Sequence, residues 1–243
     1  MNKLIQFIKL FHRAYKYQKS DIGEIAYIKA AIKKGETVFD IGAHKAGYLY
    51  FIKKQVGPSG KVYAFEPQSN LFNYIKKLKA LFNWDNVTLE HLAQSNTTGQ
   101  AQLYLPTEEV GKTSSPGATI AANEDDTNFT SLEKVTTSTL DSYCAVHNCA
   151  PSFLKIDVEG NELNIFKGGF ETLSKYKPKI IVEIESRHIG KENVMDTIRF
   201  LEAIGYKARF VKGSEYLPVS EFDFNIHQNR ADKKNYCNNF IFE

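Results

Sequence analysis

Two short apolar runs, each ending at an acid, constrain the fold of this chain most strongly. The first is VFDIGAHKAG, with Asp40 and Gly42, and the second is KVYAFEP, with Glu66. Their spacing fits a strand, a glycine turn, a helix and a second strand, which together form a βαβ unit. In α/β proteins an acid at the tip of the second strand accepts hydrogen bonds from both hydroxyls of an adenosine ribose. The pattern therefore favours a nucleoside-bearing cofactor.

The rest of the chain continues to alternate between helix and strand patterns. Helices are expected at residues 21–34, 47–55, 70–82, 162–173 and 193–204, and strands at 37–40, 62–65, 87–93, 101–105, 152–160, 179–185, 206–211 and 238–243. This order predicts an α/β fold, with a mostly parallel sheet and helices on both faces. Ligands of such sheets bind beyond the carboxyl ends of the strands. One rim should therefore gather Asp40, Glu66, Ala93, Asp157 and Glu183.

Composition limits the class of protein. The chain has 243 residues, 42% of them hydrophobic, with a net charge of +3, which fits one ordinary globular domain and no nucleic-acid partner. We expect N-terminal helices over 1–35 and the domain proper over 36–243. Cys144, Cys149 and Cys237 have no CxxC spacing, which argues against a zinc site or a disulfide framework. A cytoplasmic, reducing location fits best.

The first twenty residues form a separate pattern. Five basic residues occur without an acid, while Leu4, Ile8, Phe11 and Tyr15 recur at helical spacing. The apolar run is too short to span a bilayer or to form a signal-peptide core. The favoured interpretation is that the stripe docks on the domain. The alternative is peripheral contact of residues 1–19 with an anionic membrane, at its inner face.

The turn after the first strand helps to choose the cofactor. A dinucleotide site favours GxGxxG, but residues 42–47 read GAHKAG. A turn that does not cradle a pyrophosphate needs no middle glycine, and S-adenosylmethionine carries no phosphate. Methyl transfer is thus favoured over two alternatives. These are a nicotinamide-dependent oxidoreductase or nucleotide-sugar enzyme, and a noncatalytic adaptor that is recruited through the basic helix.

Several segments together resemble the FkbM family of S-adenosylmethionine-dependent methyltransferases. They are VFDIGAHKAGYLY, VYAFEPQSNLF, HLAQS, TTSTLDSY, FLKIDVEGNELNIFKGG and KPKIIVEIE, within residues 36–185. The most specific part is LKIDVEG followed by a helix and KPKIIVEIE. The resemblance implies a class I methyltransferase fold, with a seven-stranded sheet whose last strand is antiparallel. It also implies O-methylation of sugars, glycans or polyketide-derived hydroxyls.

The resemblance further implies residues that hold the cofactor. They are Asp40, Gly42, Ala43, Gly47, Glu66, Pro67, Leu92, Ala93 and Asp157. The family usually has asparagine where His44 stands and glycine where Ala46 stands. This departure bears on cofactor affinity, although Gly47 is expected to restore some backbone freedom one residue later.

Transfer to a hydroxyl benefits from a base. Asp157 is the first candidate, with N-capping of the next helix as its structural alternative, and His188 is the second. Glu183 and Glu185 are expected to line the acceptor pocket. Ser114 and Ser115, in the long polar segment 106–131, are expected to bind acceptor hydroxyls. No metal ligands are assigned, although Asp157 and Glu183 carry the oxygen ligands that magnesium prefers.

Overall fold

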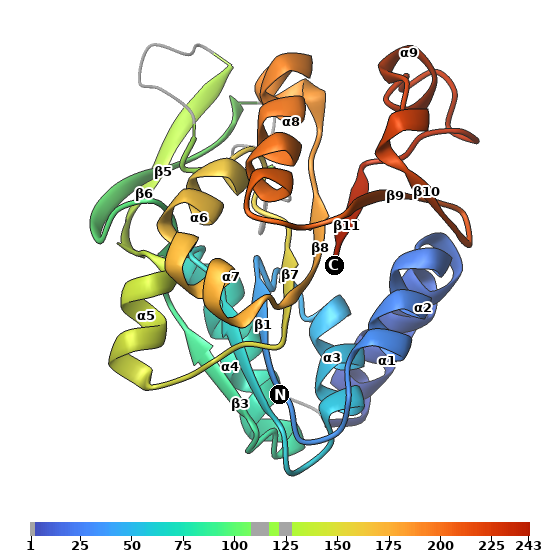
Figure 1. Cartoon of the computed structure of the whole chain (residues 1–243). Coiled ribbons are helices and arrows are strands. Elements are labelled where there is room, and N and C mark those ends of the chain that lie inside the picture. Colours follow the sequence, from blue (N-terminus) through green and yellow to red (C-terminus); the bar gives the residue numbers. More distant parts are fainter. Residues whose placement is uncertain (1–2, 108–116, 122–127) are drawn as a thin grey trace.

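The computed structural model describes residues 3–107, 117–121 and 128–243 and contains two sheets (Figure 1). The larger sheet has eight strands in the order β10-β9-β11-β8-β7-β1-β2-β3. Its strands are β1 (Thr37–Ile41), β2 (Lys61–Phe65), β3 (Val87–Glu90), β7 (Phe153–Ile156), β8 (Lys179–Glu183), β9 (Ala208–Lys212), β10 (Glu215–Pro218) and β11 (Asn239–Phe242). The smaller sheet comprises β4 (Ala93–Gln94), β6 (Phe129–Ser138) and β5 (Gly99–Pro106).

Helices cover both faces of the larger sheet, as the sequence predicts. One face carries α1 (Lys3–Ser20), α2 (Ile22–Ala31), α3 (Gly47–Val56) and α4 (Ser69–Phe82); the other carries α5 (Leu140–His147), α6 (Glu162–Gly168), α7 (Phe170–Tyr176) and α8 (Ser186–Ala203) (Figure 1). Neighbouring strand residues such as Val38 and Phe39 enter opposite core clusters, because successive side chains of a strand point to opposite faces. The short α9 (Phe224–His227) lies before β11.

The strand directions confirm most of the predicted topology. β3, β2, β1, β7 and β8 are parallel, and β11 lies antiparallel between β8 and β9. The last strand is therefore antiparallel, as expected. The sheet has eight strands rather than seven because β9 turns back into β10 through Gly213 and Ser214. Gly213 has φ of +60°, a conformation that glycine adopts without steric cost.

The expected strand over residues 87–93 is divided between the two sheets. β3 ends at Glu90, and Ala93 and Gln94 pair instead with Thr137 and Ser138 of β6. The strand predicted at 101–105 is present as β5, whereas β6 was not foreseen, since its first residues lie in the segment predicted to be a polar connection. Thr139 caps α5, because its hydroxyl accepts a hydrogen bond from the Ser142 backbone amide at 3.0 Å.

The N-terminal helix docks through a different face from the predicted one. Its buried residues are Gln6, Leu10 and Ala14, while the predicted stripe, Leu4, Ile8, Phe11 and Tyr15, is exposed. Two contacts of α1 fix this rotation. The Arg13 guanidinium donates a hydrogen bond to the Lys45 carbonyl, and the Tyr17 ring packs on Gly47, where a Cβ would lie 2.0 Å from a ring carbon.

The residue between α1 and α2 bonds to α3 and does not cap α2. Asp21 stands at the N-cap of α2, but its side chain makes no capping bond there. It accepts a hydrogen bond from the Tyr48 hydroxyl at 2.7 Å, which ties the helix junction to α3. Across the described residues, none of the helices is long and apolar enough to cross a membrane.

The rotation of α1 can be checked with two substitutions on this helix. Leu10 is 3% exposed and Ile8 is 56% exposed. We expect Leu10→Ala to lower the free energy of unfolding by about 2–3 kcal/mol, and Ile8→Ala by less than about 0.5 kcal/mol. Urea denaturation measures both. A larger loss for Ile8→Ala than for Leu10→Ala would contradict the observed docking face.

Candidate active site

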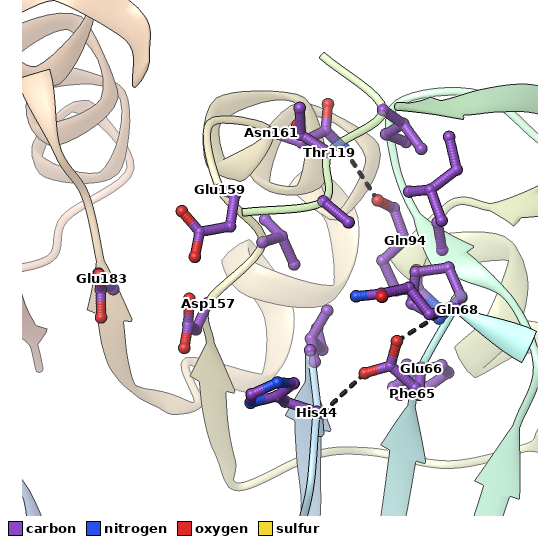
Figure 2. A pocket seen from close by; sticks show the side chains of 18 of the residues that line it. His44, Phe65, Glu66, Gln68, Gln94, Thr119, Asp157, Glu159, Asn161 and Glu183 are labelled. Carbon is purple, nitrogen blue, oxygen red and sulfur yellow. Dashed lines mark hydrogen bonds between the residues drawn. The ribbon is translucent and has the colours of Figure 1, made fainter. Parts of the chain in front are cut away.

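A cavity opens where β1, β2, β7 and β8 end (Figure 2). Its open volume, mouth included, is about 1000 Å³. The strand ends contribute Gly42, Glu66, Asp157 and Glu183, and the smaller sheet closes the opposite wall. The strand order thus gathers residues that are far apart in the sequence, as predicted from the acid-tipped strands.

Glu66 is held rigidly at the tip of β2. Its carboxylate accepts hydrogen bonds from the His44 amide at 2.7 Å and from the Gln68 amide at 2.9 Å (Figure 2). Burial raises the pKa of Glu66 to about 7, although these two backbone donors act in the opposite direction. A carboxylate fixed by its own backbone surroundings presents its remaining acceptor positions to the cavity.

The turn between β1 and α3 depends on Gly42. This residue has φ of +82°, and a Cβ there would lie 1.9 Å from the Asp157 carbonyl oxygen. Its missing side chain therefore lets β1 and β7 end side by side. His44 and Ala46 also have positive φ, of 47° and 63°. At Ala46 the left-handed backbone conformation costs about 1–2 kcal/mol of folding free energy. Burial of the methyl group offsets about 0.8 kcal/mol of this cost.

Gly47 has another role from the expected one. It is not among the residues with positive φ, so it does not restore the freedom lost at Ala46. Its lack of a Cβ instead admits the Tyr17 ring of α1. Gly47 thus shapes the cavity through the position of the Tyr17 ring, which lines it.

A buried lysine joins the two acids of the rim. The Lys155 ammonium lies 3.6 Å from Asp40 and 3.6 Å from Asp157, and it donates a hydrogen bond to the Gly42 carbonyl at 2.9 Å. Burial alone would lower the pKa of Lys155, but the two carboxylates raise it above its ordinary value. Burial raises the pKa of Asp40 to about 6, against the effect of Lys155. Sequence analysis missed Lys155, although a lysine inside an apolar strand signals a buried partner.

Three acids line the side of the cavity near β7 and β8. Asp157 and Glu183 stand at neighbouring strand ends, and Glu159 follows on the next turn with φ of +58° (Figure 2). Burial raises the pKa of Glu183 well above its ordinary value, and Asp157 and Glu159 add to this effect. The His188 Nε2 atom lies 2.6 Å from a Glu159 carboxylate oxygen. His188 therefore faces Glu159 and does not itself line the cavity.

The opposite wall combines apolar and amide groups. Leu92, Ala93 and Gln94 line it, and both polar atoms of the Gln94 side chain are buried without a hydrogen-bond partner in the described residues. Asn161 donates a hydrogen bond to the Gln94 carbonyl at 3.0 Å. A buried amide without partners is a site where a ligand can supply the hydrogen bonds.

The cavity gathers many, but not all, of the predicted site residues. It is lined by Gly42, Glu66, Pro67, Leu92, Ala93, Asp157 and Glu183. Asp40 and Ala43 are buried behind it, and Gly47 lies under Tyr17. The Glu185 carboxylate accepts hydrogen bonds from the Tyr236 hydroxyl and the side-chain amide of Asn238. Glu185 does not line the cavity. Ser114 and Ser115 lie outside the described residues.

Sequence reasoning missed several residues of the wall. Tyr17, Asp21 and Tyr48 enter from the helices, and Thr119 enters from the long connection. No local motif marks these positions. The first three depend on how α1 and the start of α2 pack against α3, and Thr119 depends on its backbone pairing with Tyr104 of β5. No metal-binding group of three or more His, Cys, Asp or Glu side chains occurs within residues 3–107, 117–121 and 128–243.

A family model and a solved structure match most of the chain. The model of the methyltransferase FkbM domain matches residues 40–208, which is more than half of the sequence. The solved FkbM methyltransferase of Methylobacillus flagellatus is 13% identical with a TM-score of 0.56, and the match covers 95% of this chain and 53% of that one. This chain therefore spans about half the length of that relative.

Two further solved structures share the fold. A proposed rRNA methylase of Clostridium thermocellum has a TM-score of 0.51 and 14% identity, covering 92% of this chain and 93% of that one. Fibrillarin of Aeropyrum pernix, in complex with natively bound S-adenosyl-L-methionine, has a TM-score of 0.50 and 10% identity. The match covers 87% of this chain and 67% of that one. At these identities the likeness concerns the fold alone. No curated protein sequence matches the chain.

The raised pKa of Glu66 predicts a pH dependence of stability. Because the folded value of about 7 exceeds the ordinary 4.5, folding favours the protonated form, and this stabilisation is lost as pH rises from 4.5 to 7. In Glu66→Gln this pH-dependent contribution to the free energy of unfolding is absent, because glutamine does not titrate. The difference in unfolding free energy, wild type minus variant, should fall by up to about 3 kcal/mol over this range. Urea denaturation at several pH values measures it, and a constant difference would contradict the assignment.

Proposed function

Because the chain belongs to the FkbM methyltransferase family, we propose that it transfers a methyl group from S-adenosylmethionine to a hydroxyl of a sugar, glycan or similar acceptor. Its fold is the class I methyltransferase fold. One observation carries the proposal. The fixed Glu66 carboxylate faces the same cavity as Asp157 and Glu183, so a nucleoside site and an acidic reaction site would share one space.

The residues of the cavity fit the proposed cofactor. Glu66 would accept hydrogen bonds from the ribose hydroxyls, and the Gly42 turn would lie under the methionine part. Leu92 and Ala93 would pack on the adenine, with the unpartnered Gln94 amide offering both a donor and an acceptor. Asp40 supports this site indirectly, by its ion pair with Lys155 behind the turn.

The proposed reaction needs a proton acceptor beside the hydroxyl. S-Adenosylmethionine, when bound, would supply an electrophilic methyl group on a positively charged sulfur, with the neutral thioether as the leaving group. Asp157 takes the hydroxyl proton, so the oxygen gains a methyl group and the carboxylate gains a proton. The nearby Lys155 ammonium holds Asp157 in place.

The acceptor is proposed to lie against the acidic wall. Glu183 and Glu159 would accept hydrogen bonds from its other hydroxyls, and Ser114 and Ser115 remain proposed contacts. His188 would serve as a positioning residue rather than as a base, since it faces Glu159. Glu185, bound by Tyr236 and Asn238, would likewise be a positioning residue rather than a part of the acceptor pocket wall. Asp157 and Glu183 also carry the oxygen ligands that magnesium prefers, but within the described part of the chain they belong to no three-residue metal-binding group.

Removal of the Glu66 carboxylate should weaken cofactor binding. We expect Glu66→Ala to raise the dissociation constant for S-adenosylmethionine at least tenfold, because two charge-assisted hydrogen bonds to the ribose are lost. Isothermal titration calorimetry measures this, and replacement of an exposed acid on β10, Glu215→Ala, is the matched control.

Thermal stabilisation of the wild type by NAD but not by S-adenosylmethionine would favour the oxidoreductase alternative. Stabilisation by neither would favour the noncatalytic adaptor.

Loss of the proposed base should affect turnover alone. We expect Asp157→Asn to bind S-adenosylmethionine within about threefold of the wild type and to lose about 10²- to 10⁴-fold in rate. The rate is measured as transfer of labelled methyl groups to the glycan fraction of the source cell. Unchanged turnover would remove Asp157 as the base. Glu183→Gln, at the neighbouring strand end, shows whether any carboxylate loss at this wall has the same effect.

A further inference from the structure

The exposed side of α1 carries a continuous apolar stripe. Phe7, Ile8, Phe11 and Tyr15 are 50%, 56%, 53% and 50% exposed, and they follow one side of the helix at helical spacing. Leu4 extends the stripe by another turn. The docked residues Leu10 and Ala14 lie on a different side. Single exposed apolar residues are common, but a contiguous row marks an interaction surface.

Positive charge is concentrated on the same helix. α1 contains five of the 31 basic residues of the chain and none of its 28 acidic residues. The remaining sequence, with 26 basic and 28 acidic residues, therefore has a formal charge of −2. The positive net charge of the protein arises in this one helix, which indicates a local anionic partner rather than a general property of the surface.

Lysines border the apolar stripe on both sides. Lys9 and Lys16 are exposed on α1 itself, and the Lys19 ammonium lies 4.6 Å from the centre of the Tyr15 ring. Beyond the other border, a groove is lined by Phe11 and Tyr15 together with Lys29 of α2 and Lys54 of α3. An apolar stripe between rows of lysines is the pattern of helices that lie in the plane of an anionic membrane surface.

We propose that α1 binds the surface of an anionic lipid bilayer, with its apolar stripe among the acyl chains and its lysines at the headgroups. A second copy of the chain is a poorer occupant, because two α1 helices in contact would bring like charges together. The same helix ends at the cavity, whose wall includes Tyr17 and Asp21. Binding to lipid therefore places the cavity wall close to the bilayer. The inference goes beyond methyl transfer and does not require it.

Vesicle cosedimentation of the full chain tests this proposal. The probes are vesicles of phosphatidylcholine alone and with about 30% phosphatidylglycerol. We expect binding to the anionic vesicles at least tenfold stronger than to the neutral ones, and weaker at about 0.5 M salt because the charges are screened. Equal binding to both vesicles, or none to either, would overturn the proposal.

Two double variants separate the apolar and the charged contributions. Ile8→Ser with Phe11→Ser should weaken binding at least tenfold, and Lys9→Gln with Lys16→Gln about twentyfold. The matched controls are Val146→Ser with Ile226→Ser, exposed on α5 and α9, and Lys167→Gln with Lys175→Gln. Both control pairs should bind like the wild type, and equal losses in them would contradict a site on α1.

Sedimentation equilibrium without lipid tests the competing occupant. A monomeric wild type supports the proposal. A dimer that Ile8→Ser with Phe11→Ser dissociates would overturn it in favour of a second copy. Thermal unfolding of each variant checks folding, and the salt dependence of the wild type keeps the proposal testable even where a variant unfolds. Binding of S-adenosylmethionine, measured separately, distinguishes failure of this inference from failure of the proposed reaction.

Discussion

The arrangement of the cavity depends on one buried cation. Lys155 lies in the central strand β7, between the acids of β1 and β7, and its ammonium also binds the carbonyl of Gly42. Without this charge, Asp40 would be a buried carboxylate with no compensating partner, and its burial would be strongly unfavourable. Lys155 thus holds both the turn that carries Gly42 and Asp157, the acid that faces the cavity.

A second constraint is the way that α1 closes the cavity. Tyr17 reaches the wall only because Gly47 has no side chain, and Arg13 fastens the helix to the carbonyl of Lys45. These contacts rotate the helix so that Gln6, Leu10 and Ala14 face the core. The larger apolar residues Ile8, Phe11 and Tyr15 therefore stay exposed on the side of α1 that faces away from the core.

Much of the sheet could be predicted from the sequence, because buried strands and glycine turns leave local signals. The tips of β1, β2, β7 and β8 were found in this way, and with them Gly42, Glu66, Asp157 and Glu183. The rotation of α1 was predicted wrongly, since periodicity identifies an apolar side but not whether the protein covers it. Tyr17 and Thr119 were missed because they reach the cavity only through packing between distant segments.

The place of Tyr17 bears on where this protein can be cut. The family match begins at residue 40, yet two residues of the cavity wall, Tyr17 and Asp21, precede it. A fragment trimmed to the matched residues would keep the acid-tipped strands but would open the cavity on the side of α3. It would also uncover Gly47 and leave Tyr48 without the partner that holds its hydroxyl. The functional unit of this chain is therefore longer than its recognisable domain.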